Sequence, residues 1–448
     1  MSACNHREEF LRLAETVLAA SRAEETEVVL LSDESYLTRF ANNVIHQNVG
    51  SRNASAVIRT VTGRRIGVAL AEGLEEDALK ATLEQSQAIA AVRPPLADFK
   101  HLPKPTKITA IEACDEATAH CSPERRADIV AELVAAAQRR GAKAAGLVET
   151  GAGQVVVANS RGVRAHHRAT SAHFQAVVTC GDGSGFAEDQ SFALGNVDIR
   201  RVIRDSVGKA VRSRKPRPNE PGEYDVVLEP DAVGPLLAML AYIGFGAKAY
   251  QEGRSFMSGK LGGKITGEPI TITDSAHHKK LRGLPFDFEG VGRKRVKLID
   301  RGAAAGVVYD SYLAGREKGR KPSTGHALPA KYATYGALPM NLVMDGGGES
   351  LRSLVRGTER GLLVTRMHYV NVVERMKAVL TGMTRDGTFW IENGRVAHPV
   401  RNLRFTESVL EAFDRADGLT RMRRVVEGDS LCPAMRIRGF RFTGKTEF

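Results

Sequence analysis

The chain has 448 residues, 42% of them hydrophobic and 26% charged, with a formal net charge of +12, which is the composition of a globular protein large enough for two or three domains. No apolar run reaches the roughly 18 residues that a membrane-spanning helix needs, and acids stand near the start, where a signal peptide would have basic residues. Five widely spread cysteines without metal-type spacing are typical of free thiols in a reducing compartment, so we expect a cytoplasmic protein.

The first predicted elements alternate between helix and strand. Residues 6–22 form an amphipathic pattern that predicts a helix, and strands are expected at "EVVLLS" and at "SAVIRTVTGRRIGVAL". The "TGRR" turn between two alternating apolar runs predicts a hairpin. A further helix is expected over residues 75–91, followed by a Pro-rich connector.

A second helix and strand group completes the N-terminal half. Ser122 is a suitable N-cap for a helix over Pro123–Arg140, and Gly141 stands just past its end. The stretch 153–186 predicts two or three strands. The predicted order, in which strands are followed by a helix and this pattern occurs twice, favours an α+β arrangement. We expect an N-terminal domain over residues 1–215 with a mixed sheet covered by helices.

The best domain boundary lies at residues 214–221, where three prolines and several charges predict a stiff, solvated connector. The second domain, residues 222–448, opens with a strand and then a helix over 231–249. The buried face of that helix is predicted from apolar residues at helical spacing, namely Leu236, Leu240, Ile243 and Ala247. Short apolar runs separated by turns such as "DRG" and "ENG" then predict a mainly antiparallel domain, curved or barrel-like.

Common catalytic motifs are absent. The Gly-rich loops at 181–186 and 345–350 lack the spacing and the Lys-Ser/Thr of a phosphate loop, and there is no HExxH. The pairs His166–His167 and His277–His278 are adjacent in sequence, so on a strand their side chains would point to opposite faces and could hold one ion together only in an irregular loop.

Three blocks of sequence carry a resemblance to a known family. "SYLTRFANNVIHQNV", "LRGLPFDFEGVGRKRVKLIDRGAAAGVVYDSYLA" and "KPSTGHA" together resemble the TldD/TldE (PmbA) family over both halves of the chain. The resemblance implies a relation to zinc metallopeptidases, in which a TldD-type subunit carries an HExxxH helix and a TldE-type subunit lacks those ligands. The helix over 231–249 is the segment that corresponds to the HExxxH helix.

On that resemblance, Ala241, Tyr242 and Gly246 stand where the family has its first His, its Glu and its second His, and residues 231–256 contain no His. Cys432 lies where the TldE-type pattern has an apolar residue. A catalytic zinc needs about three protein ligands, and it is the zinc that lowers the pKa of its water from about 15.7 to about 7. The resemblance therefore implies a non-catalytic TldE-like subunit that binds no metal itself.

The resemblance also implies partners. Such a chain would pair with a zinc-carrying TldD-like subunit, or with a second copy of itself, and enclose a cavity for unfolded or extended peptides held by backbone hydrogen bonds. The candidate residues for the cavity wall and the partner interface are Phe286, Asp287, Glu289, Arg293, Ser323, Thr324, Gly325 and His326. For Asp287 and Glu289, turn and strand-end chemistry is an equally good interpretation.

Two alternatives remain open. The chain could be an active metallopeptidase with unusual ligands from among His277, His278, His326 and Cys432. It could also be a nucleic-acid or gyrase-linked binding protein, because residues 220–448 hold 35 Lys and Arg against 26 Asp and Glu, a surplus of 9. Aromatic residues do not interleave with the basic clusters, which makes nucleic acid the less favoured partner.

Overall fold

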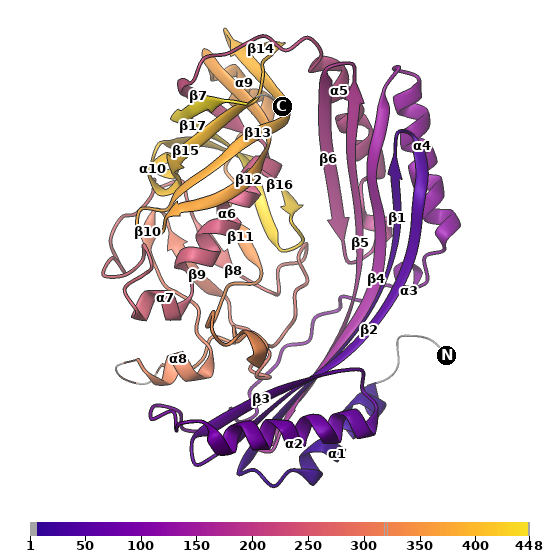
Figure 1. Cartoon of the computed structure of the whole chain (residues 1–448). Coiled ribbons are helices and arrows are strands. Elements are labelled where there is room, and N and C mark those ends of the chain that lie inside the picture. Colours follow the sequence, from indigo (N-terminus) through magenta and orange to yellow (C-terminus); the bar gives the residue numbers. More distant parts are fainter. Residues whose placement is uncertain (1–6, 318, 320, 447–448) are drawn as a thin grey trace.

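The computed structural model describes residues 7–317, 319 and 321–446, and the chain has two halves, each built around one β-sheet (Figure 1). The predicted α+β class is confirmed. Four cysteines are free thiols, and Cys4 lies outside the described residues. In the part of the chain that the structure describes, no helix has the length and apolar character needed to cross a membrane.

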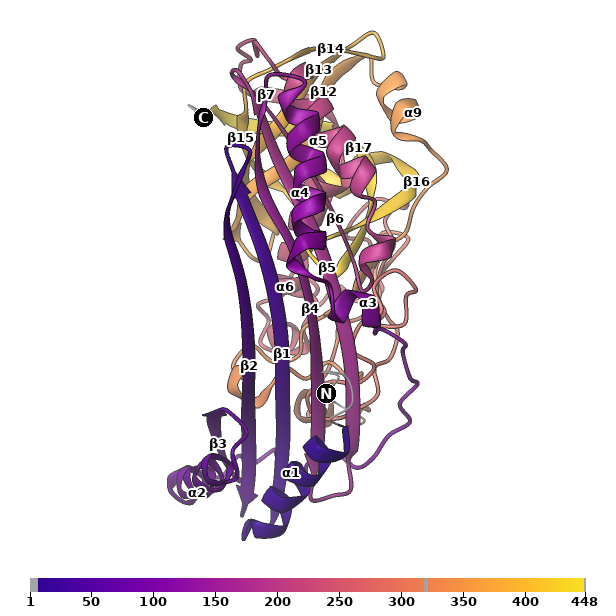
Figure 2. The same ribbon diagram turned by 90° about the vertical axis from the view of Figure 1, so that its right-hand side faces the viewer.

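The N-terminal sheet has six strands in the order β3-β2-β1-β4-β5-β6, and all of its strand pairs are antiparallel. It is therefore not the mixed sheet that the sequence predicted, because most neighbouring strands are joined by short turns that reverse the chain. Its strands are long and curve along the molecule (Figure 2). They are β1 Glu25–Ala41, β2 Val44–Thr62, β3 Arg65–Glu72, β4 Lys143–Asn159, β5 Arg164–Cys180 and β6 Gly183–Ser191.

Helices cover the two ends of this sheet and give each end its own core. One core joins α1 and α2 to the sheet around Val28 and Ile58, and the other joins α4 and α5 to it around Phe174. The predicted Ser122 cap is confirmed, since its side chain accepts from the backbone N–H of Arg125. The helical elements of this half are α1 Arg7–Ala20, α2 Glu76–Val92, α3 Glu116–Ala119, α4 Pro123–Gln138, η1 Leu194–Asn196 and α5 Ile199–Arg212.

The predicted hairpin turns are confirmed. In "TGRR", Gly63 and Arg64 have φ of 55° and 61°, which is the left-handed conformation that a tight two-residue turn requires. The "ENG" turn is built in the same way at Asn393 and Gly394, with φ of 51° and 70°.

The C-terminal sheet is mainly antiparallel, as predicted, but β7–β12 and β11–β17 are parallel pairs. Such pairs join strands that are far apart in sequence, so local sequence patterns cannot predict them. The strands are β7 Gly222–Leu228, β8 Ile272–Asp274, β9 Val296–Asp300, β10 Ala303–Ala304, β11 Leu342–Met344, β12 Arg360–Glu374, β13 Val379–Glu392, β14 Arg395–Pro399, β15 Leu403–Ser408, β16 Ala416–Val426 and β17 Ser430–Lys445.

The predicted helix over 231–249 exists but is broken. Helix α6 runs over Pro230–Gly244, and α7 begins again at Ala247 and ends at Gln251. Leu236, Leu240 and Ile243 are buried in the main core of this half, which confirms the predicted apolar face. The remaining helical elements are α8 Ser311–Gly315, η2 Ala330–Tyr332, α9 Leu351–Arg356 and α10 Val409–Asp414.

A buried ion pair links the halves near the connector. Lys209 of α5 places its Nζ 2.5 Å from Oε2 of Glu229, the residue before α6, and both side chains are buried. Arg217 of the connector forms a bridge with Val400. The proposed boundary at 214–221 stays a prediction, and this contact means that separating the halves would expose buried charge.

Candidate functional site

The break after α6 falls where the resemblance places the metal motif. Ala241 is buried, Tyr242 is partly exposed, and Gly246 lies beyond the helix, just before α7. A Cβ at Gly246 would lie 2.4 Å from the backbone oxygen of Ala337, closer than real Cβ contacts allow. The third motif position therefore has no room for a side chain unless the backbone around Ala337 moves.

Tyrosines form the surface beside this break. The rings of Tyr242 and Tyr335 have centroids 6.5 Å apart, and those of Tyr332 and Tyr335 are also 6.5 Å apart. The three side chains are 42%, 46% and 52% exposed in chain order. The guanidinium of Arg375 lies 5.2 Å from the Tyr242 ring centroid. This tyrosine cluster, Tyr242, Tyr332 and Tyr335, was not predicted, although "KYATY" places two of its members three residues apart.

The alternative metal ligands have different neighbours in the structure. Nε2 of His277 lies 3.2 Å from the backbone oxygen of Thr109. Cys432 is buried in β17 opposite Arg424. Burial raises the pKa of its thiol well above the ordinary value, and nearby carboxylates, chiefly Asp231, raise it further. Asp231 lies in the first turn of α6, and ten residues of helix, about 15 Å, separate it from Ala241.

Within the described ranges, no group of three or more His, Cys, Asp and Glu side chains is arranged to hold a metal ion. The residues that the resemblance places at the HExxxH positions offer no imidazole and no carboxylate. A catalytic zinc does not fit this donor set, because it requires about three such ligands around one point.

The candidate loop 286–292 is inserted between the halves. Phe286 is buried in a cluster with Val29 and Val57 of the N-terminal sheet. Gly290 has a φ of 72°, and a Cβ there would lie 2.3 Å from Val163. The loop thus reaches the N-terminal sheet closely, and its apolar part holds the two halves together.

Asp287 organises that loop. Its Oδ1 accepts from the backbone N–H of Glu289 and Val291, at 3.0 and 2.9 Å, and its Oδ2 accepts from that of Ala327 at 2.9 Å. Burial and repulsion from Glu289 raise the pKa of Asp287 in spite of these three donors. The geometry matches the turn chemistry considered for this residue, which is enclosed and does not face a cavity.

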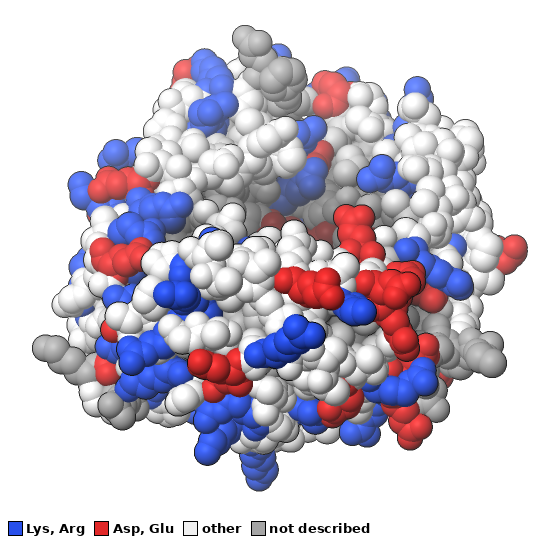
Figure 3. Space-filling model, turned by 60° about the horizontal axis from the view of Figure 1, so that its bottom comes forward, with Lys and Arg blue, Asp and Glu red and all other residues white. Residues whose placement is uncertain are grey.

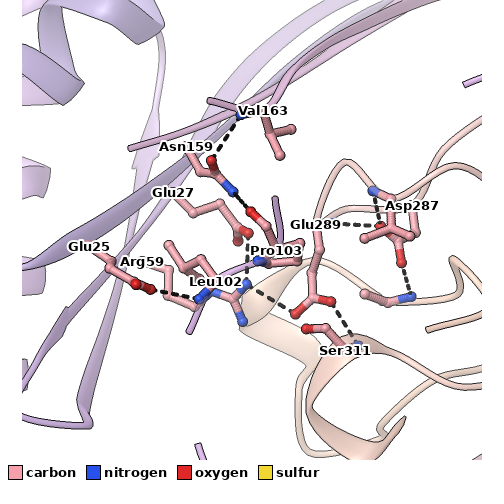
Figure 4. A network of polar contacts seen from close by, with 12 residues as sticks. Glu25, Glu27, Arg59, Leu102, Pro103, Asn159, Val163, Asp287, Glu289 and Ser311 are labelled. Atoms are coloured by element: carbon pink, nitrogen blue, oxygen red, sulfur yellow. Dashed lines mark hydrogen bonds and ion pairs between the residues drawn. The ribbon is translucent and has the colours of Figure 1, made fainter. Parts of the chain in front are cut away.

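Glu289 belongs to a buried charge network that crosses between the halves (Figure 4). Nη2 of Arg59, on β2, lies 2.7 Å from Oε2 of Glu27 and 3.1 Å from Oε1 of Glu289. Oε2 of Glu289 also accepts from the backbone N–H of Ser311 at 3.0 Å. One guanidinium thus serves two carboxylates, and burial raises the pKa of Glu27 to about 7 although Arg59 opposes the shift. We call Glu27, Arg59 and Glu289 the Arg59 network.

A second buried network surrounds Asp274 at the end of β8. Arg293 Nη2 lies 2.5 Å from Asp274 Oδ1, and His326 Nε2 lies 2.8 Å from the same oxygen. Oδ2 accepts from the backbone N–H groups of Met340 and Asn341, both at 2.8 Å. Burial opposes ionisation, yet His326 and Arg293 hold the pKa of Asp274 well below its ordinary value. We call Asp274, Arg293 and His326 the Asp274 network.

The remaining candidates shape the turn that presents His326. Ser323 and Thr324 both donate their hydroxyls to the backbone oxygen of Tyr309, at 3.1 and 3.0 Å. Gly325 has a φ of 75°, and a Cβ there would lie 2.6 Å from the backbone oxygen of Gly292. The sequence-predicted candidates are therefore brought together, but mostly as buried turn and ion-pair chemistry.

A pocket of about 930 Å³ opens beside the Arg59 network. Glu289 is the candidate residue on its wall, together with Arg59 and with Ile66, Val68 and Leu70, which share one face of β3. Loop 327–336 lines the opposite side and also carries two members of the tyrosine cluster. Viewed from below, the surface is hollowed, with cations and carboxylates around the hollow (Figure 3). The pocket volume lies within the range of sites that bind small molecules or short peptide segments.

Comparison with known families matches nearly the whole chain. The PmbA/TldA metallopeptidase domain 1, central domain and C-terminal domain match residues 26–90, 98–214 and 221–444 respectively. These matches are consecutive and together span both halves of the fold.

Among curated proteins, a metalloprotease of Methanothermobacter thermautotrophicus is 28% identical over 54% of this chain and 51% of its own length. A metalloprotease PmbA homologue of Buchnera aphidicola is 24% identical over 57% of this chain and 55% of its own. A zinc metalloprotease TldD homologue of Saccharolobus solfataricus is 22% identical over 50% of each chain. The chain spans about half the length of the curated relatives it matches.

Two solved structures share the fold over nearly their full length. TldE from Thermococcus kodakarensis superposes with a TM-score of 0.87 at 21% identity, covering 98% of this chain and 99% of the other. A Thermotoga maritima protein named as a candidate modulator of a DNA gyrase gives a TM-score of 0.86 at 17% identity, covering 97% of this chain and 100% of the other. At these identities the likeness establishes the fold and nothing more.

Proposed function

The chain belongs to the PmbA/TldD metallopeptidase family, and from that membership we propose that it is a TldE-like, non-catalytic subunit of a zinc peptidase that acts on unfolded or extended peptides. Its partner would be a TldD-like subunit that carries the zinc, with a homodimer as the second possibility. The subunit contributes wall and binding surface to the chamber, while the partner contributes metal and general base.

One observation carries the proposal. On the family resemblance, Ala241, Tyr242 and Gly246 occupy the positions of the HExxxH motif, and a Cβ at Gly246 would lie 2.4 Å from the backbone oxygen of Ala337. The site has thus lost its ligands and also the space for one of them. Without two imidazoles and a carboxylate, neither a zinc-bound water nor a base to deprotonate it is available in this chain.

The pocket beside β3 supports a peptide-binding role. β3 is an edge strand of the N-terminal sheet, and in the described part of the chain no strand pairs with its outer edge. An extended peptide can add to such an edge through backbone hydrogen bonds, which explains recognition independent of sequence. Ile66, Val68 and Leu70 would then contact alternate side chains of the bound peptide.

The test is zinc analysis and peptide hydrolysis by the full chain, alone and mixed with a TldD-like partner. We expect less than stoichiometric zinc and no chelator-sensitive cleavage of an unfolded protein by the chain alone, and cleavage when the partner is added. Stoichiometric zinc in the isolated chain at near-neutral pH would contradict the proposal.

A partner with its motif Glu replaced by Gln is the matched control. The mixed complex should then lose cleavage, because the only general base would be gone. If cleavage by the mixture survived that substitution, the base would have to come from this chain.

The alternatives make different predictions. An active enzyme with unusual ligands from among His277, His278, His326 and Cys432 would cleave without a partner and stop on chelation. A gyrase-linked nucleic-acid protein would retain duplex DNA in a steeply salt-dependent way at about 50 mM salt. The lack, among the described residues, of any group of three potential ligands arranged to hold a metal ion argues against the first alternative.

A further inference from the structure

A second pocket, of about 650 Å³, lies far from the candidate residues, at the end of the molecule where α5 of the N-terminal half meets α9 and β14 of the other half (Figures 1 and 2). Four arginines line it: Arg212, Arg352, Arg356 and Arg395. We call it the arginine pocket. Neither the proposed peptide role nor the metal motif uses it.

The cations of this pocket are not neutralised. Arg352, Arg356 and Arg395 form no ion pair with any described residue, and Arg212 contacts only the backbone oxygen of Gly208 and the ring of Phe389. Glu229 is the one carboxylate on the wall. It is already paired with Lys209 at 2.5 Å and with Arg424 at 3.7 Å, so it does not offset the arginines.

The backbone holds these arginines in place. Ser350 caps α9 through the backbone N–H of Ser353, and Val355 of the same helix is buried. A Cβ at Gly394 would lie 2.6 Å from the backbone oxygen of Arg356, so the β13–β14 turn packs directly on the end of α9. Arg356 and Arg395 therefore stand on two segments in direct contact.

The guanidinium groups and apolar residues of the arginine pocket indicate which kind of ligand it can bind. A guanidinium presents paired N–H donors that match phosphate oxygens, and several guanidiniums facing one space favour more than one phosphate. Val355 and Leu363 add apolar wall for a part of the ligand that carries no charge, and the volume suits a small molecule. We infer that the arginine pocket binds a small molecule that carries two or more linked phosphates, either a nucleoside polyphosphate or an inorganic polyphosphate.

Binding would have a structural consequence. Arg212 belongs to the N-terminal half, whereas Arg352, Arg356 and Arg395 belong to the C-terminal half. A polyphosphate in contact with both sets ties the halves together at the end opposite the Arg59 network. A ligand that binds only the folded chain raises its melting temperature, and the rise continues with the logarithm of the ligand concentration once the site is saturated.

The test uses the full chain and calorimetric titration with inorganic tripolyphosphate, ATP and adenosine in parallel at about 50 and 150 mM salt. We expect saturable one-to-one binding of tripolyphosphate and ATP, weaker at the higher salt, and none of adenosine. Tighter binding of ATP than of tripolyphosphate identifies a nucleotide, and the reverse identifies an inorganic polyphosphate, the same chemistry in both cases.

The variant R352Q/R395Q removes two exposed charges of the pocket and should weaken binding at least about tenfold. The control R404Q/R421Q removes two exposed arginines elsewhere in the same half and should leave it unchanged. Absence of saturable binding to the parent, an equal loss in the control, or binding of duplex DNA in place of the small polyphosphates would overturn the inference.

Discussion

Two regions contain residues that carry the family resemblance: the junction between the halves and the end of α6. The two regions differ in the chemical character of those residues. At the junction, the Asp274 and Arg59 networks bury carboxylates and guanidiniums within hydrogen-bond distance of each other. At the end of α6, the positions expected to be polar hold Ala241, Tyr242 and Gly246, and the nearby surface is aromatic. Charged side chains are therefore concentrated at the junction, where they stabilise the fold, and are missing at the end of α6, where metal binding and catalysis would need them.

The two networks at the junction also differ from each other. Asp274 meets Arg293, His326 and two backbone donors, and its pKa falls. Glu27 shares one guanidinium with Glu289, and its pKa rises to about 7. Burial raises the pKa of both carboxyls, and the charged neighbours differ: His326 and Arg293 both lower the pKa of Asp274, whereas Glu27 has Arg59 alone and is repelled by Glu289.

The largest effect is expected from Asp274→Asn. The substitution keeps the shape but leaves Arg293 buried without a counter-charge, and we expect a loss of about 3–5 kcal/mol in the free energy of unfolding. Urea denaturation measures it. Asp300→Asn is the control, because Asp300 pairs with Lys297 at the surface and should cost at most about 1 kcal/mol. Equal effects of the two variants would mean that the Asp274 network is not a buried ion-pair network.

Arg59→Met should lower the free energy of unfolding by about 1.5–3 kcal/mol near pH 8, because Glu27 and Glu289 lose a charged hydrogen-bond donor. The cost should shrink towards pH 5, where protons can neutralise the carboxyls in place of the guanidinium. Denaturation at both pH values measures the difference. A cost that grew as the pH fell would contradict this description of the network.

In the parent chain, the contribution of Glu27 to the free energy of unfolding should also depend on pH, and it should be larger at low pH. Its folded pKa of about 7 lies above the unfolded value of about 4.3. The folded state therefore binds more protons between those values, so the contribution of Glu27 to stability is full below about pH 4 and is lost as the pH rises to about 7. Asp274 acts in the opposite direction, since its lowered pKa makes its contribution present above about pH 4 and lost below it. The difference between the parent and Glu27→Gln, measured from pH 4 to pH 8, isolates the first effect.

Gly246→Ala should destabilise by about 1–3 kcal/mol, because the added Cβ meets the backbone oxygen of Ala337 at 2.4 Å. Gly208→Ala is the matched control in α5. A Cβ there meets nothing within 4 Å, so helix propensity should make that variant more stable by up to about 1 kcal/mol. If Gly246→Ala were neutral, the third motif position would be open to a ligand after all.

The smallest effect on stability is expected from Tyr242→Ala, about 0.5–1 kcal/mol, because the side chain is partly exposed and lies outside the buried core. Its effect on peptide binding should be larger, about three- to tenfold, through loss of the contacts with Tyr335 and Arg375 if a peptide lies on this surface. Fluorescence anisotropy of a labelled unfolded peptide measures it. Tyr369→Ala, an exposed tyrosine outside the tyrosine cluster, should leave the affinity unchanged.

Local patterns in the sequence predicted the local structure well. Ser122 and Pro123 marked a helix start, and the "TGRR" and "ENG" turns marked two hairpins, because caps and left-handed turn residues act over a few positions. β1 is longer than the "EVVLLS" run predicted, since its second part is only half-buried and carries no continuous apolar pattern. The parallel pairs of the C-terminal sheet depend on contacts between strands far apart in sequence.

The candidate site was predicted less completely. The resemblance named Asp287, Glu289 and Arg293 as candidates for a cavity wall and partner interface. It did not name Arg59 and Asp274, which lie on other elements and pair with Glu289 and Arg293. The tyrosine cluster was missed because Tyr242 and Tyr335 are 93 positions apart in the sequence and meet only through the fold. A role in peptide binding for any of these residues stays a prediction.

The central claim, that this chain is a subunit without its own catalytic metal, is tested most directly by zinc stoichiometry. Native mass spectrometry and metal analysis would be made on the isolated chain, and then on its complex with a TldD-like partner. The account predicts no stoichiometric zinc in the isolated chain and one zinc for each complex, held by the partner. One zinc for each isolated chain, lost together with peptide cleavage on chelation, would contradict it.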